Sequence, residues 1–202
     1  MAEAVRFGSD NIDLKFIGDY EEDRDWSGSY SEMLIWLENA ALAKAEYDIL
    51  LFPWSTGYTL GNEQPFETQE ILRQLEEISN EKIVILPAGS RSSPSRYSSV
   101  AKSALLASAL SDGGNKPAEY SDYDPNSYWL SGASPVTDSD GKSVGTGTAY
   151  AAANLSALIA KANLTSPTTA RKLLDDVAYQ SGDRAQKVIP ISKFLDEALN
   201  NE

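Results

Sequence analysis

The sequence predicts an α/β fold, in which a mostly parallel sheet is covered by helices on both faces. Two apolar runs without polar alternation, at 47–53 and 83–86, are typical of strands buried on both sides. Other segments place apolar residues at helical spacing, and the two kinds of segment alternate along the chain. Such alternation favours a parallel sheet. A length of 202 residues suits a single domain with a sizeable core.

The first half of the chain predicts four strands and two helices. We expect strands at 14–17, 47–53, 83–86 and 104–110, each a short apolar run. The expected helix at 29–45 has an apolar stripe of Met33, Leu34, Leu37, Ala41 and Leu42. The expected helix at 66–79 repeats this pattern with Ile71, Leu72, Leu75 and Ile78. Residues 1–13 ahead of them are interpreted as an N-terminal arm.

The second half predicts a long irregular region followed by three helices. Residues 111–145 are rich in Ser, Asp, Gly and Tyr and are expected to be loop. Helices are expected at 146–162, 166–178 and 192–199. The helix at 166–178 has a typical start, because Ser166 can cap its first turn and Pro167 takes the favoured first position.

The composition excludes several classes of function. A net charge of -13 argues against nucleic acid and anionic membranes as partners. No apolar run reaches the roughly 18 residues of a membrane span, and the N-terminus lacks the apolar segment of a signal peptide. The chain has no cysteine and no histidine, so thiol chemistry is excluded and neither a zinc site nor a cofactor is expected. We expect a cytoplasmic protein, or an extracellular one if a signal-bearing N-terminal part has been removed.

Two stretches resemble the subtilases, the family of subtilisin-like serine proteases. The stretch 145–160 begins Gly-Thr-Gly-Thr-Ala-Tyr-Ala-Ala-Ala, similar to the family's Gly-Thr-Ser-x-Ala-Ala-Pro at the start of a buried helix. Gly147 stands where that family has its nucleophilic serine. The stretch 82–90 ends Pro-Ala-Gly-Ser and resembles the strand that ends Ala-Ala-Gly-Asn. Ser90 stands where the family has the asparagine that donates to the oxyanion.

The resemblance covers about residues 14–199 and implies a three-layer αβα subtilisin-like domain. In the family, the catalytic aspartate and histidine lie ahead of the strand that matches 14–17. The resemblance therefore implies a single truncated domain, 1–202, without these N-terminal elements. Acyl transfer needs a nucleophile, a base and an oxyanion donor. With Gly147, Ser90 and no histidine, we expect no enzyme activity.

We therefore interpret the chain as a non-catalytic, subtilase-like pseudoprotease that serves as a protein-binding, peptide-binding, scaffold or assembly module. The alternatives are a protease part completed by another chain, or a hydrolase of unrelated chemistry. In the family, the segment that matches 53–57 pairs with extended substrate. The expected groove therefore comprises Pro53, Trp54, Ser55, Thr56, Gly57 and Tyr150. Pro53 lacks an N–H, so part of the backbone hydrogen bonding between this segment and an extended peptide is lost.

The sequence also predicts contact surfaces rich in aromatic residues. Core packing explains Trp36 and Trp129, and the remaining aromatic residues near strand ends suit a protein contact surface. These are Trp54, Tyr58, Tyr120, Tyr123, Tyr128 and Tyr150. Without the first strands, a second apolar face would be left uncovered, which predicts a homodimer or a protein partner. That face comprises Phe16, Ile17, Trp36 and Leu37.

Two further patterns are weaker. Ser99 and Lys102 have the S-x-x-K spacing of penicillin-binding proteins, but the companion motifs of that class are absent. Four carboxylates could supply oxygen ligands for a structural calcium ion, which subtilases often bind in surface loops. They are Asp122, Asp124, Asp138 and Asp140. A solvated acidic loop is the preferred interpretation, and no metal site is expected.

Overall fold

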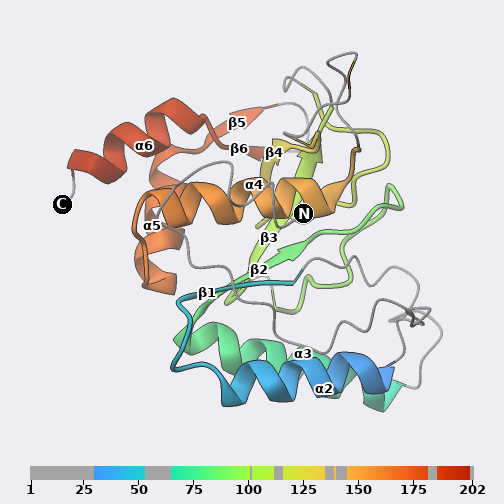
Figure 1. Ribbon diagram of the computed structural model, residues 1–202. Helices are drawn as coiled ribbons and strands as arrows, with labels where there is room; N and C mark the ends of the chain where they lie inside the picture. The colour runs from blue at the N-terminus through green and yellow to red at the C-terminus, as the bar shows by residue number, and fades with distance from the viewer. Residues whose placement is uncertain are drawn as a thin grey trace.

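The computed structural model shows three layers, with the sheet between two layers of helices (Figure 1). It describes residues 30–52, 65–100, 102–111, 116–134, 139, 145–181 and 186–200. The expected arm 1–13 and the expected strand 14–17 lie outside these residues. The predicted three-layer α/β fold is confirmed for the described part of the chain.

The sheet of the described residues has six strands in the order β1-β2-β3-β4-β6-β5. Neighbours from β1 to β6 are parallel, and only β5 runs antiparallel, against β6. The predicted, mostly parallel sheet is therefore confirmed. The strands are β1 (Ile49–Leu51), β2 (Ile83–Pro87), β3 (Leu105–Leu110), β4 (Tyr128–Ser131), β5 (Tyr179–Ser181) and β6 (Gln186–Val188).

Helices flank the sheet on both faces, close to the predicted positions. The helices α2 (Tyr30–Leu42) and α3 (Pro65–Glu81) cover one face. The other face is covered by α4 (Thr148–Lys161), α5 (Pro167–Val177) and α6 (Ile191–Asn200). The predicted start of α5 is confirmed, because the Ser166 side chain accepts a hydrogen bond from the Thr169 N–H at 3.4 Å.

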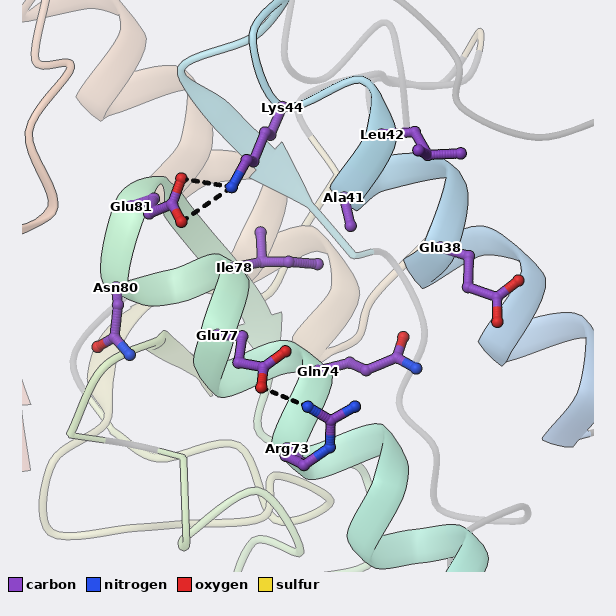
Figure 2. Close-up of a pocket in the computed structure, with 10 residues that line it drawn as sticks. All are labelled: Glu38, Ala41, Leu42, Lys44, Arg73, Gln74, Glu77, Ile78, Asn80 and Glu81. Atoms are coloured by element: carbon purple, nitrogen blue, oxygen red, sulfur yellow. Dashed lines mark hydrogen bonds and ion pairs between the residues drawn. The ribbon is translucent and has the colours of Figure 1, made fainter.

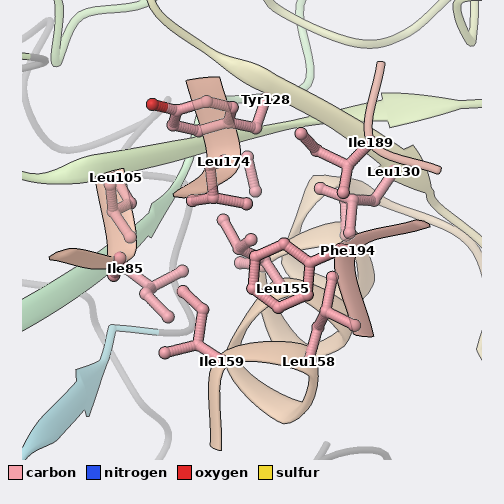
Figure 3. Close-up of a cluster of buried hydrophobic side chains, with 14 of the residues drawn as sticks. Ile85, Leu105, Tyr128, Leu130, Leu155, Leu158, Ile159, Leu174, Ile189 and Phe194 are labelled. Atoms are coloured by element: carbon pink, nitrogen blue, oxygen red, sulfur yellow. The ribbon is translucent and has the colours of Figure 1, made fainter. Parts of the chain in front are cut away.

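Strand residues alternate between two cores, as the pleat of a sheet requires. Val84 and Leu86 of β2 pack against α2 and α3 with Leu37 and Leu75. On the opposite face, residues of β2, β3 and β4 pack against α4, α5 and α6 (Figure 3). This second cluster includes Ile85, Leu105, Tyr128, Leu130, Leu155, Leu158, Ile159, Leu174, Ile189 and Phe194. Helix α4 is therefore a core element, buried along most of its length.

Two sequence predictions need correction. The region 111–145 is not loop throughout, because β4 lies within it as a buried strand between β3 and β6. Its four residues follow a turn at 124–127 and are too few to produce a long apolar run. The predicted stripe of α2 was also partly wrong, since Ala41 and Leu42 are exposed and Ala40 packs in their place.

Among the described residues, no helix combines the length and the apolar character that crossing a membrane requires.

Candidate functional site

The N-terminus of α4 forms the centre of the candidate site. Gly147 precedes the helix with φ 159° and ψ 165°, a backbone conformation that favours glycine. Its N–H donates to the carbonyl oxygen of Gly132 at 2.8 Å, which ties the helix start to the end of β4. No described side chain caps the helix, and its first turn carries no acidic residue. The positive end of the helix dipole is therefore not neutralised by a carboxylate of its own first turn.

Gly147 has space around it. Among the described residues, a Cβ built there would meet no atom closer than the Ala149 nitrogen at 4.0 Å. No described atom fills the volume that a side chain would occupy beside the helix N-terminus, where a peptide carbonyl could accept hydrogen bonds.

The loop that follows β2 is held in place by the buried carboxylate of Asp122. One oxygen, Oδ1, accepts hydrogen bonds from the N–H groups of Arg91 at 2.6 Å and Ser93 at 3.0 Å. It also accepts one from the Ser93 hydroxyl at 3.2 Å. Gly89 has φ 120°, and a Cβ there would lie 2.1 Å from Asp122 Oδ2, so this position requires glycine. The backbone around Ser90 is thereby fixed.

Ser90 and α4 meet across this corner. The Oγ of Ser90 lies 3.2 Å from the Oγ1 of Thr148, the first residue of α4. Thr148 is buried whereas Ser90 is exposed, so the Ser90 hydroxyl faces the solvent at the helix N-terminus. The two positions that the sequence singled out, Gly147 and Ser90, are thus brought together although they are far apart in the chain.

Two tyrosines pack around the backbone of the site. A Cβ on Gly145 would lie 2.7 Å from the Tyr150 hydroxyl, so this side chain covers Gly145. A Cβ on Gly132 would lie 2.6 Å from the Tyr120 hydroxyl. Burial raises the pKa of Tyr120, against the opposing effect of hydrogen bonds with Thr146 and Gly147. Both rings therefore pack closely against glycines, and each glycine provides the space that its ring requires.

The chemistry available at this corner is that of hydrogen bonding. Gly147 brings no hydroxyl, and the chain contains no imidazole that could take a proton from Ser90 or Thr148. The buried carboxylate of Asp122 is occupied by the backbone N–H groups that it holds. A helix N-terminus and an exposed hydroxyl are suited to a carbonyl or carboxylate oxygen of a ligand.

The other residues of the predicted groove are only partly described. The segment 53–57 lies outside the described residues, as does Tyr58. Tyr150 is half-buried at the start of α4 and faces Gly145. Its place beside the helix N-terminus suits the predicted groove, and its contact with a ligand stays a prediction.

The predicted self-association face is described only in part. Phe16 and Ile17 lie outside the described residues. Trp36 is half-buried, whereas Leu37 is fully buried between α2 and α3. Leu37 is therefore a core residue and is not available to a partner, because α2 turns this side chain toward the sheet. Association through the rest of the face stays a prediction.

Of the other described aromatic residues, Trp129 and Tyr128 are buried, whereas Tyr123 is half-buried. Trp129 is buried, as predicted, and Tyr123 packs beside it with Leu110 and Val188. The Tyr128 ring is also buried, and its hydroxyl donates to Asp175 Oδ1 at 3.0 Å. Burial raises the pKa of Tyr128. The sequence predicted that Tyr128 belongs to a contact surface, and this was wrong, because the side chain is buried and joins β4 to α5.

The predicted calcium ligands divide into two pairs. Asp138 and Asp140 lie outside the described residues. Asp124 is buried and accepts the Asn126 N–H at 2.7 Å, while Asp122 holds the Ser90 loop. Within the described ranges, no group of three or more acidic side chains is placed to hold a metal ion.

The S-x-x-K pair does not have the geometry that its pattern requires. Ser99 and Lys102 are exposed and lie in consecutive turns rather than on a helix. A lysine one helical turn from a serine is the arrangement that activates the hydroxyl in that class of enzyme. The described turn does not provide it.

Asp122 is the residue whose role in the site was missed from the sequence. It was considered only as a metal ligand, yet it fixes a loop about thirty residues earlier in the chain. Thr148 was also not singled out. The one local signal was Gly89, since a glycine after a buried strand can mark a close approach of another group to the backbone.

Comparison with solved structures places this fold among the subtilisin-like proteases. A variant of the protease domain of PatA superposes with a TM-score of 0.61 at 16% identity, over 86% of this chain and 66% of that one. The prenylagaramide maturation protease PagA gives 0.58 at 14% identity, over 82% and 67%. The nisin leader peptidase NisP from Lactococcus lactis gives 0.58 at 11% identity, over 83% and 62%.

These similarities define the fold: the chain has the subtilisin-like fold. It spans about two thirds of the length of these protease chains. No protein-family model matches the sequence. No curated protein matches it either.

Proposed function

We propose that this chain is a non-catalytic subtilisin-like domain that binds an extended polypeptide at the corner formed by Ser90 and the N-terminus of α4. The observation that carries the proposal is the contact of Ser90 with Thr148 beside the open position of Gly147. A peptide carbonyl could accept hydrogen bonds from the Ser90 hydroxyl and the first N–H groups of α4. Gly147 offers no hydroxyl to attack that carbonyl, and the chain contains no histidine to activate one.

The argument against catalysis is chemical. Loss of a serine-protease triad lowers turnover by about six orders of magnitude. Here the nucleophile position is Gly147, and no histidine exists anywhere in the chain. A second chain could supply a base, but it would find no hydroxyl at Gly147.

The argument for binding is the arrangement of the donors. The exposed Ser90 hydroxyl and the α4 N-terminus lie beside Gly147, whose surroundings are open among the described residues, and Asp122 holds the Ser90 loop in position. A preorganised loop loses little conformational freedom on binding, which favours affinity. Tyr150 beside the helix start adds apolar surface to the same corner.

The neighbours suggest the ligand class. NisP is a leader peptidase and PagA a maturation protease, so each acts on a peptide precursor. A domain with the same fold and without the nucleophile is suited to hold such a chain uncut. We therefore propose a peptide segment in extended conformation as the ligand, with scaffolding of a partner as the cellular role.

Selection from a library of random linear peptides, followed by fluorescence anisotropy of the selected sequences, tests the proposal. Ser90→Trp would fill the corner and should weaken binding at least about tenfold, since it removes the hydroxyl and blocks the helix N-terminus. Ser99→Trp, on an exposed turn, is the matched control and should leave binding unchanged.

Equal binding by both variants would place the peptide elsewhere and contradict the proposal. Cleavage of the selected peptides by the pure protein would instead support a hydrolase of unrelated chemistry.

A further inference from the structure

A groove lies between α2 and α3, on the outer surface of the layer opposite α4 (Figure 2). Its volume is about 720 Å³. Ile78 of α3 points toward α2, and Ala41 lies opposite it. The pair Lys44–Glu81, 2.7 Å apart, closes the groove where the two helices end.

Two apolar side chains of α2 are exposed to solvent, and one of them, Leu42, lines the groove. Leu42 is 84% exposed at the end of α2. Ile35, one heptad earlier on the same helix, is 54% exposed. Residues seven apart on a helix lie on the same side, so these two side chains mark one apolar line along α2. A line of this kind beside a groove is suited to a partner element.

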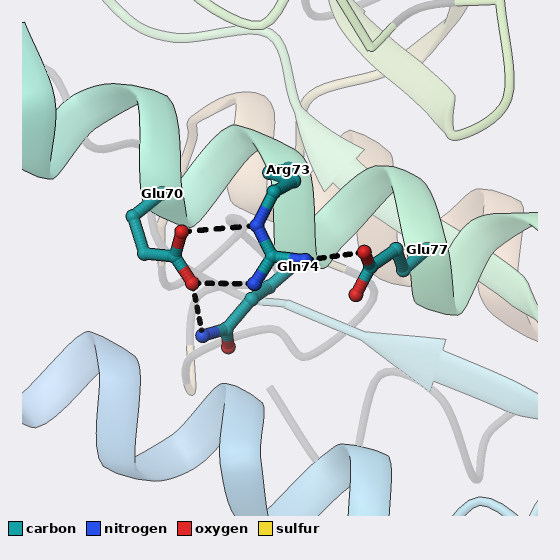
Figure 4. Close-up of polar contacts among 4 residues, drawn as sticks. All are labelled: Glu70, Arg73, Gln74 and Glu77. Atoms are coloured by element: carbon teal, nitrogen blue, oxygen red, sulfur yellow. Dashed lines mark hydrogen bonds and ion pairs between the residues drawn. The ribbon is translucent and has the colours of Figure 1, made fainter.

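Three carboxylates, Glu38, Glu77 and Glu81, and two cations, Lys44 and Arg73, line this groove. Arg73 is held by Glu70 at 2.6 Å and by Glu77, so its charge is already neutralised (Figure 4). Hydrogen bonds from Arg73 lower the pKa of Glu70 to about 2. Lys44 is likewise paired with Glu81. Glu38, which lines the groove, makes no ion pair within the described residues.

The C-termini of α2 and α3 add partial negative charge beside the groove. Neither α2 nor α3 carries a basic residue in its last turn, although a helix C-terminus favours cations. The two C-termini lie at the same end of the layer, as the contact of Lys44 with Glu81 shows (Figure 1). Two helix C-termini and Glu38 therefore border the groove, and the two described lysines at that end, Lys44 and Lys82, are paired with Glu81 and Asp48.

We propose that this groove binds an amphipathic, basic helix of a partner protein. A groove between two helices is the shape into which the ridge of a third helix packs. Apolar residues of the partner would cover Ala41 and Leu42, and its lysines or arginines would face Glu38 and the helix ends. A second copy of this chain fits poorly, because two chains with a net charge of -13 repel each other.

This surface is separate from the peptide site. The groove belongs to the layer of α2 and α3, whereas Ser90 and Gly147 lie at the start of α4, which packs on the other face of the sheet. Both could be occupied at once. The groove does not depend on the proposed function: Ser90→Trp tests the peptide site, whereas Leu42→Ser and Glu38→Gln test the groove.

The test uses the whole chain and a synthetic probe. The probe is a labelled leucine-lysine peptide of about fourteen residues, with leucines at helical spacing, about 21 Å long as a helix. That length matches α2, which has 13 residues. Two control peptides accompany it. One has glutamate in place of lysine, and the other has the same composition in an order without an apolar stripe.

Leu42→Ser should weaken binding of the leucine-lysine peptide about tenfold, because the variant removes an apolar side chain that the peptide would bury. Glu38→Gln should weaken it a few-fold and reduce its sensitivity to salt. The matched controls on α6 are Leu199→Ser, whose leucine is 71% exposed, and Asp196→Asn. Neither should change the affinity.

Three results would overturn the proposal. The first is no binding of the leucine-lysine peptide. The second is equal binding of the scrambled peptide or equal losses in the α6 controls, which would mean that negative charge alone attracts the probe. The third is self-association that Leu42→Ser abolishes, which would make a second copy the occupant.

Discussion

The burial of α4 is the feature on which the interpretation of this fold depends, and charged substitutions test it. Ala153 is 0% exposed and Leu158 is 5% exposed. Leu158 belongs to the cluster that joins α4 to Phe194 of α6 (Figure 3). Ala153→Asp or Leu158→Asp would place a carboxylate in this apolar surrounding without a cationic partner among the described residues.

The magnitude follows from the burial. An unpaired charge in a core costs several kcal/mol, against a typical stability of about 5–15 kcal/mol for a whole domain. Either aspartate variant should therefore fail to fold as a soluble protein. Leu158→Ala is milder and should cost about 2–5 kcal/mol, which lowers the Tm by about 4–20 °C. Lys161→Ala, exposed in the last turn of α4, should cost about 1 kcal/mol or less.

Soluble yield and thermal melts followed by circular dichroism give the measurement. An unchanged Tm in both aspartate variants would show that α4 lies on the surface, and would refute the subtilisin-like arrangement.

Three other predictions concern stability and association. The pKa of Tyr47 is raised from 10.0 to about 12, by burial first and then by Glu81, so its neutral form is favoured in the fold. The contribution of Tyr47 to the free energy of unfolding is complete below pH 10 and is lost as the pH rises toward 12. Urea titrations at a series of pH values should show a smaller loss of stability for Tyr47→Phe than for the parent chain. An equal loss in both would contradict this prediction. Ser166→Ala removes the cap of α5 and should lower the Tm by about 2–4 °C, while the exposed control Thr165→Ala should not; equal effects would exclude capping. Light scattering over a range of concentrations should show a dimer or a complex formed through Phe16, Ile17 and Trp36, and a strictly monomeric mass with no partner in pull-downs would contradict this.

The helices and the first buried strands could be predicted because their patterns are local. The stripe of Ile71, Leu75 and Ile78 is carried by one segment and is buried as expected. Strand β4 has only four residues and follows a turn, so local sequence gives too little apolar periodicity to identify it. The hairpin of β5 and β6 was missed for the same reason, since each strand has three residues.

The site was predictable only where a motif marked it. Gly147 and Ser90 were singled out through resemblance, and the structure brings them to one corner. The role of Asp122 could not be inferred, because its hydrogen bonds join residues about thirty positions apart and leave no local pattern. The exposure of Leu42 depends on how α2 turns against the sheet, which periodicity alone does not determine.

The central claim is that this fold binds without catalysis, and labelling with a fluorophosphonate probe tests its chemical part most directly. The pure chain should gain no probe mass, and it should not hydrolyse casein or peptide anilides. Gly147→Ser introduces a hydroxyl at a position whose φ of 159° disfavours a side chain, so its fold is first checked by circular dichroism. The folded variant should also remain unlabelled, because the chain offers no imidazole to activate the hydroxyl. Stoichiometric labelling of any serine in the parent chain would contradict the account, and labelling at Ser99 would support the S-x-x-K alternative.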